Sequence, residues 1–220
     1  MTFLKYCVIS PVKQYDKTFD RWLECVLNFN PFPSDILIAT EDEDFPKDPR
    51  YKIVDSSGEL IYIPSSVLGT EAERQYRISN AREHLRRYIL RNTDYQFILS
   101  IDCDILVKEP YLPVVMFGTM ALTGSQMLYN VVTCKETNYP PFVSLACVAF
   151  TRNILELFSF TVFGGWSEDS SFMLQINSSN PSLNFKASFG KLVKVIHVKD
   201  GKEFESEDPD FMVYEIKPKS

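Results

Sequence analysis

The sequence lacks the signatures of several common protein classes. It holds only two histidines in 220 residues and no G-x-S-x-G segment, which argues against a Ser-His-Asp hydrolase. Its five cysteines form no C-x-x-C pair, so neither a structural zinc site nor a dithiol redox centre is expected, and the scattered thiols fit a reducing compartment. G-x-G-x-x-G, Walker A and H-E-x-x-H segments are also missing, which removes the usual signs of dinucleotide, P-loop and zinc-protease sites.

Long hydrophobic runs and an excess of positive charge are missing as well. No apolar run approaches the roughly 20 residues that cross a bilayer, so we expect no transmembrane segment. No charged leader followed by an apolar stretch opens the chain, which makes a cytoplasmic location the expectation. Asp and Glu number 29 against 23 Lys and Arg, a formal net charge of −6. Because nucleic acid binding relies on clustered Lys and Arg, nucleic acid is not an expected partner.

The first half of the chain alternates short apolar runs with helical patterns. Runs that are apolar on both faces predict buried strands, and shorter runs predict two further strands; the segments are 4–9, 36–39 and 95–101, then 51–54 and 60–63. Apolar residues spaced as on one helix face predict a helix between the first two strands, with Phe19, Trp22, Leu23, Val26 and Leu27. The order β-α-β-loop-α-β is typical of an open parallel sheet with helices on both faces.

A second helix precedes the strand at 95–101. Its apolar stripe consists of Ala81, Leu85, Tyr88 and Ile89. Asn80 followed three residues later by Glu83 fits a capping box and predicts that the helix begins there, and residues 92–94 end it.

The second half of the chain has weaker patterns. Strands are predicted at 120–122, 130–133, 144–151 and 192–198, and helices at 153–158 and 169–176. The charged tail, 199–220, ends in an alternating stretch at 211–216 that fits an edge strand, a lid or a loose end.

Two aspartates form the sharpest local feature. Asp102 and Asp104 flank Cys103 just after the buried strand at 95–101, so both carboxylates can turn toward one point at the carboxyl edge of the sheet. Hard divalent cations such as Mg²⁺ or Mn²⁺ prefer oxygen ligands of this kind and share them with phosphate and water. The alternative is that one aspartate simply caps a turn, but the position at the ligand edge favours the metal.

Two further polar features lie downstream. The segment 164–169 (GGWSED) opens a helix, where Glu168 or Asp169 would be held as an anion by the helix dipole and could act as a general base. An ordinary helix cap is the alternative for Asp169. His197 ends an apolar strand and could complete a metal site with Asp102 and Asp104, or could be a structural histidine.

Together these features resemble the GT-A family of glycosyltransferases, which move a sugar from a nucleotide-diphosphate donor to an acceptor hydroxyl. The resemblance covers residues 4–198 and includes an Asn-x-Arg-like helix segment (Asn80, Arg82), the D-x-D motif, the Glu-Asp pair and a late histidine. It implies an α/β fold: a single GT-A (Rossmann-like) domain at 1–198 with a mixed, mostly parallel sheet flanked by helices on both faces. A nucleotide-sugar half would span about 1–108 and an acceptor half about 109–198.

The resemblance also implies roles for particular residues. Asp104 and His197 would bind Mn²⁺ or Mg²⁺. Asp102 would contact the donor's ribose, or the metal through water, and Cys103 would also belong to the donor site. Asp169 would be the base of an inverting enzyme, with Glu168 positioning a substrate. Donor contacts would come from Ser10, Lys13 and Arg82. The donor would be a UDP- or GDP-sugar, and the acceptor a carbohydrate, a lipid-linked sugar or a protein.

Rival functions share parts of this pattern. The segment 101–106 (IDCDIL) is similar to the first motif of haloacid-dehalogenase-like Mg²⁺-dependent phosphatases, in which the first aspartate is the nucleophile, but that motif belongs on the first strand. A nucleotidyltransferase would need a glycine-rich loop after the first strand, and residues 10–17 contain no glycine. A non-catalytic relative that binds a nucleotide-sugar or glycan is the third alternative.

Overall fold

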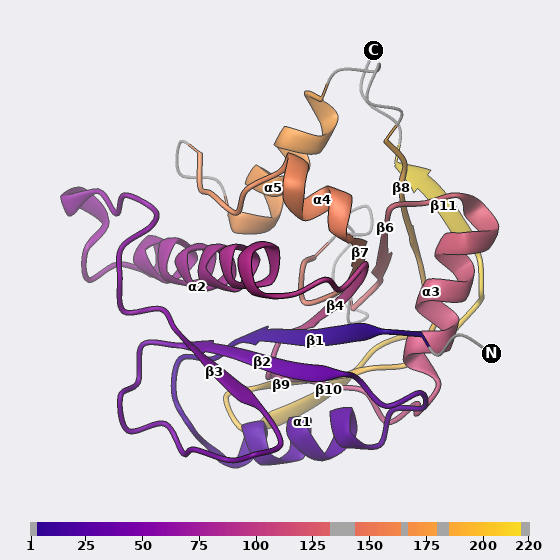
Figure 1. The fold of residues 1–220 in the computed structure, drawn as a ribbon, viewed down its shortest axis with the longest axis horizontal. Coiled ribbons are helices and arrows are strands. Elements are labelled where there is room, and N and C mark those ends of the chain that lie inside the picture. Colours follow the sequence, from indigo (N-terminus) through magenta and orange to yellow (C-terminus); the bar gives the residue numbers. More distant parts are fainter. Residues whose placement is uncertain (1–3, 133–143, 164–166, 180–184, 217–220) are drawn as a thin grey trace.

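An eight-stranded sheet forms the centre of the molecule (Figure 1). The computed structural model describes residues 4–132, 144–163, 167–179 and 185–216. The strands lie in the order β11-β8-β6-β7-β4-β1-β2-β3, and only β7 and β11 run against the others. The predicted mixed, mostly parallel α/β sheet is therefore confirmed, and its parallel strands end at one edge.

The first half of the chain follows the predicted order of elements. They are β1 (Tyr6–Pro11), α1 (Lys17–Leu27), β2 (Asp35–Thr40), β3 (Lys52–Asp55), the short 3₁₀ helix η1 (Ser65–Val67), α2 (Glu71–Asn92) and β4 (Phe97–Ile101). In α1 the predicted apolar face is buried, and the Asp16 carboxylate caps the helix by accepting from the N–H groups of Thr18 and Phe19.

The second half adds the antiparallel strands and a small second sheet. Its elements are β5 (Ile105–Leu106), α3 (Leu112–Thr123), β6 (Met127–Asn130), β7 (Cys147–Thr151), α4 (Arg152–Leu157), α5 (Glu168–Asn177), β8 (Ala187–Gly190), β9 (Ile196–Lys199), β10 (Lys202–Glu205) and β11 (Val213–Ile216). Strands β10, β9 and β5 form the small sheet, and β11 is an edge strand paired with β8.

Helices cover both faces of the large sheet, as predicted (Figure 1). One hydrophobic core lies between the sheet and α1, α3 and the small sheet, with Trp22, Phe19 and Met116 fully buried. The other lies under α2, α4 and α5, with Leu85 and Phe172 fully buried. Burial of this apolar surface holds the strands in register and so fixes the carboxyl edge where polar side chains gather. Among the described residues, no helix has the length and apolar character needed to cross a membrane.

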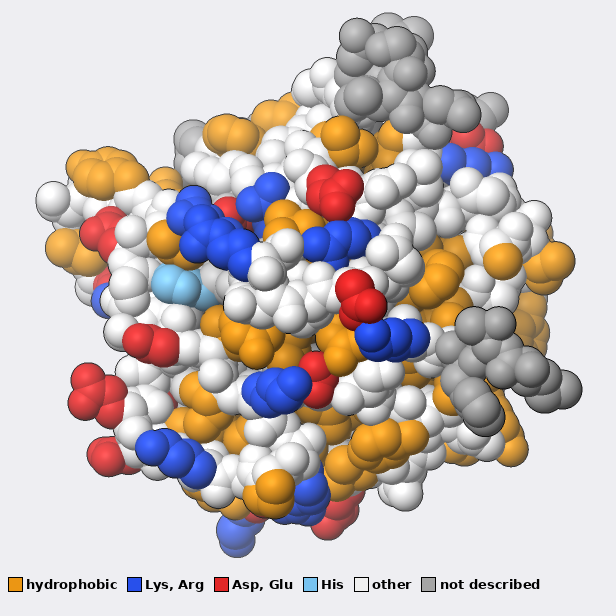
Figure 2. All heavy atoms as spheres, viewed as in Figure 1, with side chains coloured by type: hydrophobic (Ala, Val, Ile, Leu, Met, Phe, Trp, Pro, Cys, Tyr) orange, Lys and Arg blue, Asp and Glu red, His pale blue; other side chains and the backbone are white. Residues whose placement is uncertain are grey.

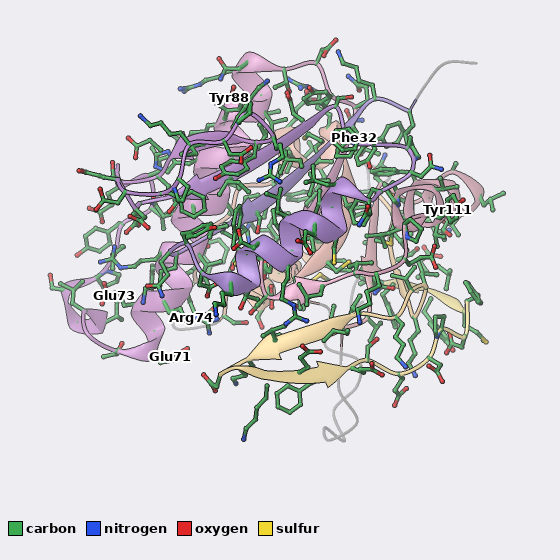
Figure 3. All side chains as sticks on the ribbon, turned by 90° about the horizontal axis from the view of Figure 1, so that it is seen from below. Phe32, Glu71, Glu73, Arg74, Tyr88 and Tyr111 are labelled. Carbon is green, nitrogen blue, oxygen red and sulfur yellow. The ribbon has the colours of Figure 1, made fainter. Side chains whose placement is uncertain are left out.

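The predicted start of the second helix is wrong. Helix α2 begins at Glu71, well before Asn80, and Figure 3 shows Glu71, Glu73 and Arg74 at this projecting end. The acidic first turn suits the positive end of the helix dipole. Asn80 is a buried mid-helix residue whose side chain accepts from the N–H groups of Leu60 and Ile61 and donates to the carbonyl of Gly58. The residues that resemble a capping box therefore do not cap the helix, and the Asn80 side chain instead holds the loop at 58–61.

Two of the predicted strands are also wrong, and a third, at 130–133, is displaced: β6 covers Met127–Asn130, and the described residues directly after it are not strand. Residues 120–122 belong to α3, whose buried side chains Leu112, Met116 and Met120 follow a helical spacing. The segment is apolar on nearly every side, and such runs do not separate strand from helix by periodicity. Gly124 ends α3 with a φ of 67°, a conformation that suits glycine. Residues 60–63 form a loop, in which the N–H groups of Leu60, Ile61 and Ile63 donate to the side chains of Asn80 and Glu59 rather than to a neighbouring strand.

Candidate active site

The D-x-D segment lies where the chain turns out of β4. The N–H of Asp102 donates to the carbonyl of Ala146 at 2.9 Å, and the N–H of Ile105 donates back to the Asp102 carbonyl at 2.9 Å. This tight turn leads directly into β5, so the two aspartate side chains leave the backbone at the carboxyl edge of the large sheet. Their position at that edge agrees with the expectation from the sequence.

A buried arginine joins the D-x-D segment to the Glu-Asp pair. The Arg82 side chain of α2 is 2% exposed, and its guanidinium donates to Ser100 Oγ at 2.9 Å and to Asp102 Oδ1 at 2.7 Å. Its Nε forms an ion pair with the carboxylate of Glu168, which is 4% exposed. All three nitrogens of the guanidinium therefore have a polar partner within the protein, two through hydrogen bonds and Nε through the ion pair, and these contacts link β4, α2 and α5.

The negative charge around Arg82 exceeds its single positive charge. Burial raises the pKa of Asp102 to about 6, with Asp104 and Asp169 adding to the shift and Arg82 opposing it. Burial likewise raises the pKa of Glu168 to about 8 against the opposing effect of Arg82. Burial alone would lower the pKa of Arg82, but the carboxylates of Asp102, Glu168 and Asp169 outweigh it and raise that pKa. Such a surplus of carboxylates is the electrostatic setting in which a bound cation is stabilised.

Asp104 and His197 meet although they are far apart in the sequence. Strand β5 pairs antiparallel with β9, with Ile105 opposite His197, and the N–H of Val198 donates to the Asp104 carbonyl at 2.8 Å. This pairing places His197 Nε2 3.3 Å from Asp104 Oδ2, and both side chains are 35% exposed. They are therefore open to solvent, in contrast to Arg82 and Glu168.

The metal-ligating atoms at this edge suit a divalent cation whose other ligands are phosphate and water. Asp104 offers a carboxylate and His197 an imidazole at contact distance, next to the surplus charge of Asp102. Across the described residues, no group of three or more His, Cys, Asp or Glu side chains is arranged to hold a metal by itself. A Mg²⁺ or Mn²⁺ ion commonly takes only one or two protein ligands and completes its shell with substrate phosphates and water.

Cys103 does not share the chemistry of the aspartates that flank it. Burial, followed by the Asp104 and Asp102 carboxylates, raises the pKa of the Cys103 thiol, so it stays protonated. That Cys103 contacts the donor stays a prediction. A protonated thiol would make this contact through its shape, or the residue would make it through its backbone.

The Glu-Asp pair opens α5, as predicted. Ser167 caps the helix by accepting from the N–H of Ser170 at 3.2 Å, and Asp169 Oδ1 accepts from the N–H of Leu145 at 2.9 Å. Asp169 is half-buried at the carboxyl edge, whereas Glu168 is buried against Arg82. The glycines and tryptophan of the motif, at 164–166, lie outside the described residues.

Ser10 and Lys13, the two predicted donor contacts at the end of β1 and in the loop after it, differ in their exposure. Ser10 is fully buried inside the sheet, so its hydroxyl does not face the edge. Lys13 is exposed and contributes, after Gly69 and Arg77, to lowering the pKa of Glu73 at the start of α2. Lys13 is therefore an exposed cation near the start of α2.

Several positioning residues escaped the sequence analysis. Asn130, 1% exposed at the end of β6, accepts from the N–H groups of Leu192 and Val193 at 2.9 Å each, and so holds the segment that leads to His197. Gln75 Oε1 accepts from the N–H of Glu168 at 3.3 Å. Ser100, a buried polar residue in an otherwise apolar strand, supports Arg82. Of these three residues, only Ser100 could have been identified from the sequence, because a polar residue inside a buried strand needs a hydrogen-bond partner.

No protein-family model matches the sequence, and no curated protein does. Solved structures do match. A197 from STIV is similar with a TM-score of 0.54 at 13% identity, over 93% of this chain and 95% of that one. S. aureus TarS is similar with a TM-score of 0.53 at 12% identity, over 78% of this chain and 33% of TarS.

A third similar structure carries ligands in its description. It is glucosyl-3-phosphoglycerate synthase from Mycobacterium tuberculosis in complex with Mn²⁺, UDP and phosphoglyceric acid, with a TM-score of 0.52 at 13% identity. The alignment covers 82% of this chain and 66% of the synthase, so the chain spans about two thirds of that protein and a third of TarS. At such identities the likeness establishes the fold, which is the GT-A fold: a mixed α/β sheet flanked by helices.

Proposed function

We propose that this protein is a metal-dependent glycosyltransferase that moves a sugar from a nucleotide-diphosphate donor to an acceptor hydroxyl. The observation that carries the proposal is the convergence of Asp102, Glu168 and Asp169 around one buried arginine, with Asp104 next to Asp102, at the carboxyl edge of a GT-A sheet. Structural neighbours with Mn²⁺ and UDP support the same class of chemistry. The fold disfavours the phosphatase alternative, whose aspartate motif belongs on the first strand, whereas here it follows β4.

Asp104 and His197 would hold the metal. A divalent cation at this position supplies Lewis-acid stabilisation of the charge that develops on a departing nucleotide diphosphate. Both side chains are partly exposed and lie at contact distance, so they can receive the ion without rearranging the core. Asp102 would face the donor's ribose or a metal-bound water, with its carboxylate oriented by Arg82.

Arg82 would act on the donor indirectly. Because its guanidinium is buried and forms ion pairs with Asp102 and Glu168, its part is to hold these two carboxylates in place rather than to touch the diphosphate. Lys13 is the exposed cation of the β1 loop and would approach the diphosphate. Ser10, a buried residue near the end of β1, would contribute by setting the point from which the loop leaves the sheet.

Asp169 would be the general base toward the acceptor. One of its carboxylate oxygens accepts from the Leu145 N–H, which fixes the side chain, and no other described residue is hydrogen-bonded to the second oxygen, which would take a hydroxyl. Residues 1–108 would then form the donor half of the molecule and residues 109–198 the acceptor half. The acceptor would be a carbohydrate, a lipid-linked sugar or a protein that meets the edge between them.

The function can be tested without knowing the acceptor. Purified protein is incubated with UDP-, GDP- and other nucleotide-sugars in Mn²⁺ or Mg²⁺, and release of the nucleotide diphosphate is measured. We expect release from one donor, and its loss when EDTA removes the metal, because the leaving diphosphate then lacks its counter-charge. Absence of both release and donor binding across the whole panel would overturn the proposal.

Asp104→Asn should raise the Mn²⁺ concentration needed for half-maximal release by about tenfold or more, since replacing groups at a metal site costs on this scale. The substitution keeps the side-chain size and an oxygen near His197. Asp208→Asn is a matched control, because it removes the same charge from an exposed side chain that pairs with Lys194. An unchanged metal requirement in Asp104→Asn would remove Asp104 from the metal site.

A further inference from the structure

A cavity of about 380 Å³ lies beside α2, outside the carboxylate cluster. Ala81, Leu85 and Ile89 of α2 pack onto the sheet, while Glu83 and Arg87, on another side of the helix, line the cavity. The remaining walls are the loop 60–64 and the segment 159–162 after α4. Its volume falls in the range of roughly 300–1,000 Å³ that is usual for small-molecule sites.

The buried carboxylate of Glu83 orients the charged side chains on one wall of this cavity. Glu83 is 4% exposed and accepts from Arg86 and Arg87 at 3.0 Å each and from the N–H of Phe160 at 3.2 Å. The Glu83 carboxylate thus orients the guanidinium groups of both arginines and holds the segment 159–162 on the other side of the cavity. The local balance is one negative charge against two positive charges, in a chain whose net charge is −6. Figure 2 shows Lys and Arg side chains gathered over α2 on this face.

The terminal N–H groups of the Arg87 guanidinium are available to a ligand. Its Nε is used by Glu83, and within the described part of the chain its two terminal nitrogens have no hydrogen-bond partner. The side chain is 41% exposed, so these nitrogens can reach a ligand. A planar guanidinium held in this way is the group that best recognises phosphate or carboxylate.

Hydroxyl groups line the rest of the cavity. Tyr76, Ser159 and Thr161 contribute to its walls, and among the described residues none of their hydroxyls has a hydrogen-bond partner. Tyr76 is 8% exposed, so its hydroxyl has little access to solvent except through the cavity. Leu60 and Pro64 add apolar surface. The lining therefore offers one fixed cationic group, several hydroxyls and an apolar side, which matches a small anion that carries hydroxyl groups of its own.

We propose that this cavity is a second binding site, for a small hydroxylated anion such as a phosphorylated or carboxylated sugar, with Arg87 binding the anionic group. The site is separate from the carboxylate cluster and does not depend on the proposed transferase function. It lies on the same helix as the cluster: Glu83 follows Arg82, and Tyr76 follows Gln75, which contacts Glu168. An occupant therefore contacts the helix that positions the cluster.

Isothermal titration calorimetry with three probes tests the site on the full chain: glucose 6-phosphate, glucuronate and glucose. We expect binding of at least one charged sugar and none of glucose at the same concentration, and the charged sugar that binds distinguishes phosphate from carboxylate. Arg87→Gln should weaken that binding by about tenfold or more, as expected for a charge-assisted hydrogen bond. Thr161→Val, which removes a hydroxyl at nearly constant volume, should weaken it by a smaller factor.

Asp104→Asn is the control that separates the two sites, and it should leave binding of the charged sugar unchanged. Circular dichroism melting of Arg87→Gln verifies that the half-exposed substitution leaves the fold intact. Three results would each overturn the proposal: no charged sugar binds at millimolar concentration, Arg87→Gln binds as well as the wild type, or binding disappears in Asp104→Asn. The last result would place the anion at the carboxylate cluster instead.

Discussion

Asp169→Asn should lower metal-dependent release of the nucleotide diphosphate by about 10²–10⁴-fold, the range by which a positioned general base accelerates such steps. With water as the acceptor the base has the same task as with a sugar hydroxyl, so the donor alone suffices for the measurement. The asparagine keeps the carbonyl oxygen that accepts from the Leu145 N–H, so the start of α5 should stay in place. Affinity for the nucleotide diphosphate in Mn²⁺ should change little.

Two comparisons make the Asp169 result specific. Asp208→Asn removes an equal charge from an exposed position and should release the nucleotide diphosphate at the wild-type rate. If Asp169→Asn loses nucleotide affinity in parallel with rate, the residue serves in binding instead. If its rate is unchanged, Asp169 is not the base, and the remaining carboxylates of the cluster have to be tested in its place.

Arg82→Met should destabilise the protein by about 3–5 kcal/mol above pH 8, because it leaves the buried carboxylates of Glu168 and Asp102 without their partner. The loss should shrink as the pH is lowered from above 8 to about 6. In the wild type the pKa of Glu168 is already raised to about 8 and that of Asp102 to about 6, and removing the guanidinium raises both further. The variant therefore takes up protons on these carboxyls at a higher pH than the wild type does, and the difference in stability stops changing once both proteins are protonated. Urea unfolding at several pH values measures both effects.

Arg87→Met is the matched control for Arg82. It removes the same side chain from the same helix, but Arg87 is 41% exposed and its partner Glu83 keeps Arg86. We expect a loss of no more than about 1 kcal/mol, as for exposed ion pairs. Arg82→Lys should fall between the two, because it keeps a charge but not the three-way fork. Equal losses for Arg82→Met and Arg87→Met would contradict the structural role of Arg82.

Local patterns in the sequence were sufficient for four elements of the first half: β1, α1, β2 and β4. The buried strands β1, β2 and β4 are runs of apolar residues with no polar face, and α1 has a clean helical stripe, so each is specified by its own residues. The errors fall where one local pattern permits two structures. Asn80 with Glu83 looks like a helix start, yet tertiary contacts with the loop 56–61 use the Asn80 side chain within a continuous helix. The uncharged helix α3 reads equally well as a strand.

The chemical groups of the candidate site can be identified from the sequence: a D-x-D segment after a buried strand, a Glu-Asp pair at a helix start and a single late histidine. Those features depend on residue type and on position along one element, which a linear pattern records. Which of these groups meet depends on the three-dimensional fold. Pairing of β5 with β9 brings His197 to Asp104, and burial of Arg82 between β4 and α5 joins Asp102 to Glu168. Such contacts between distant segments follow from how the sheet and helices bury their apolar surfaces together, and no local pattern specifies that arrangement.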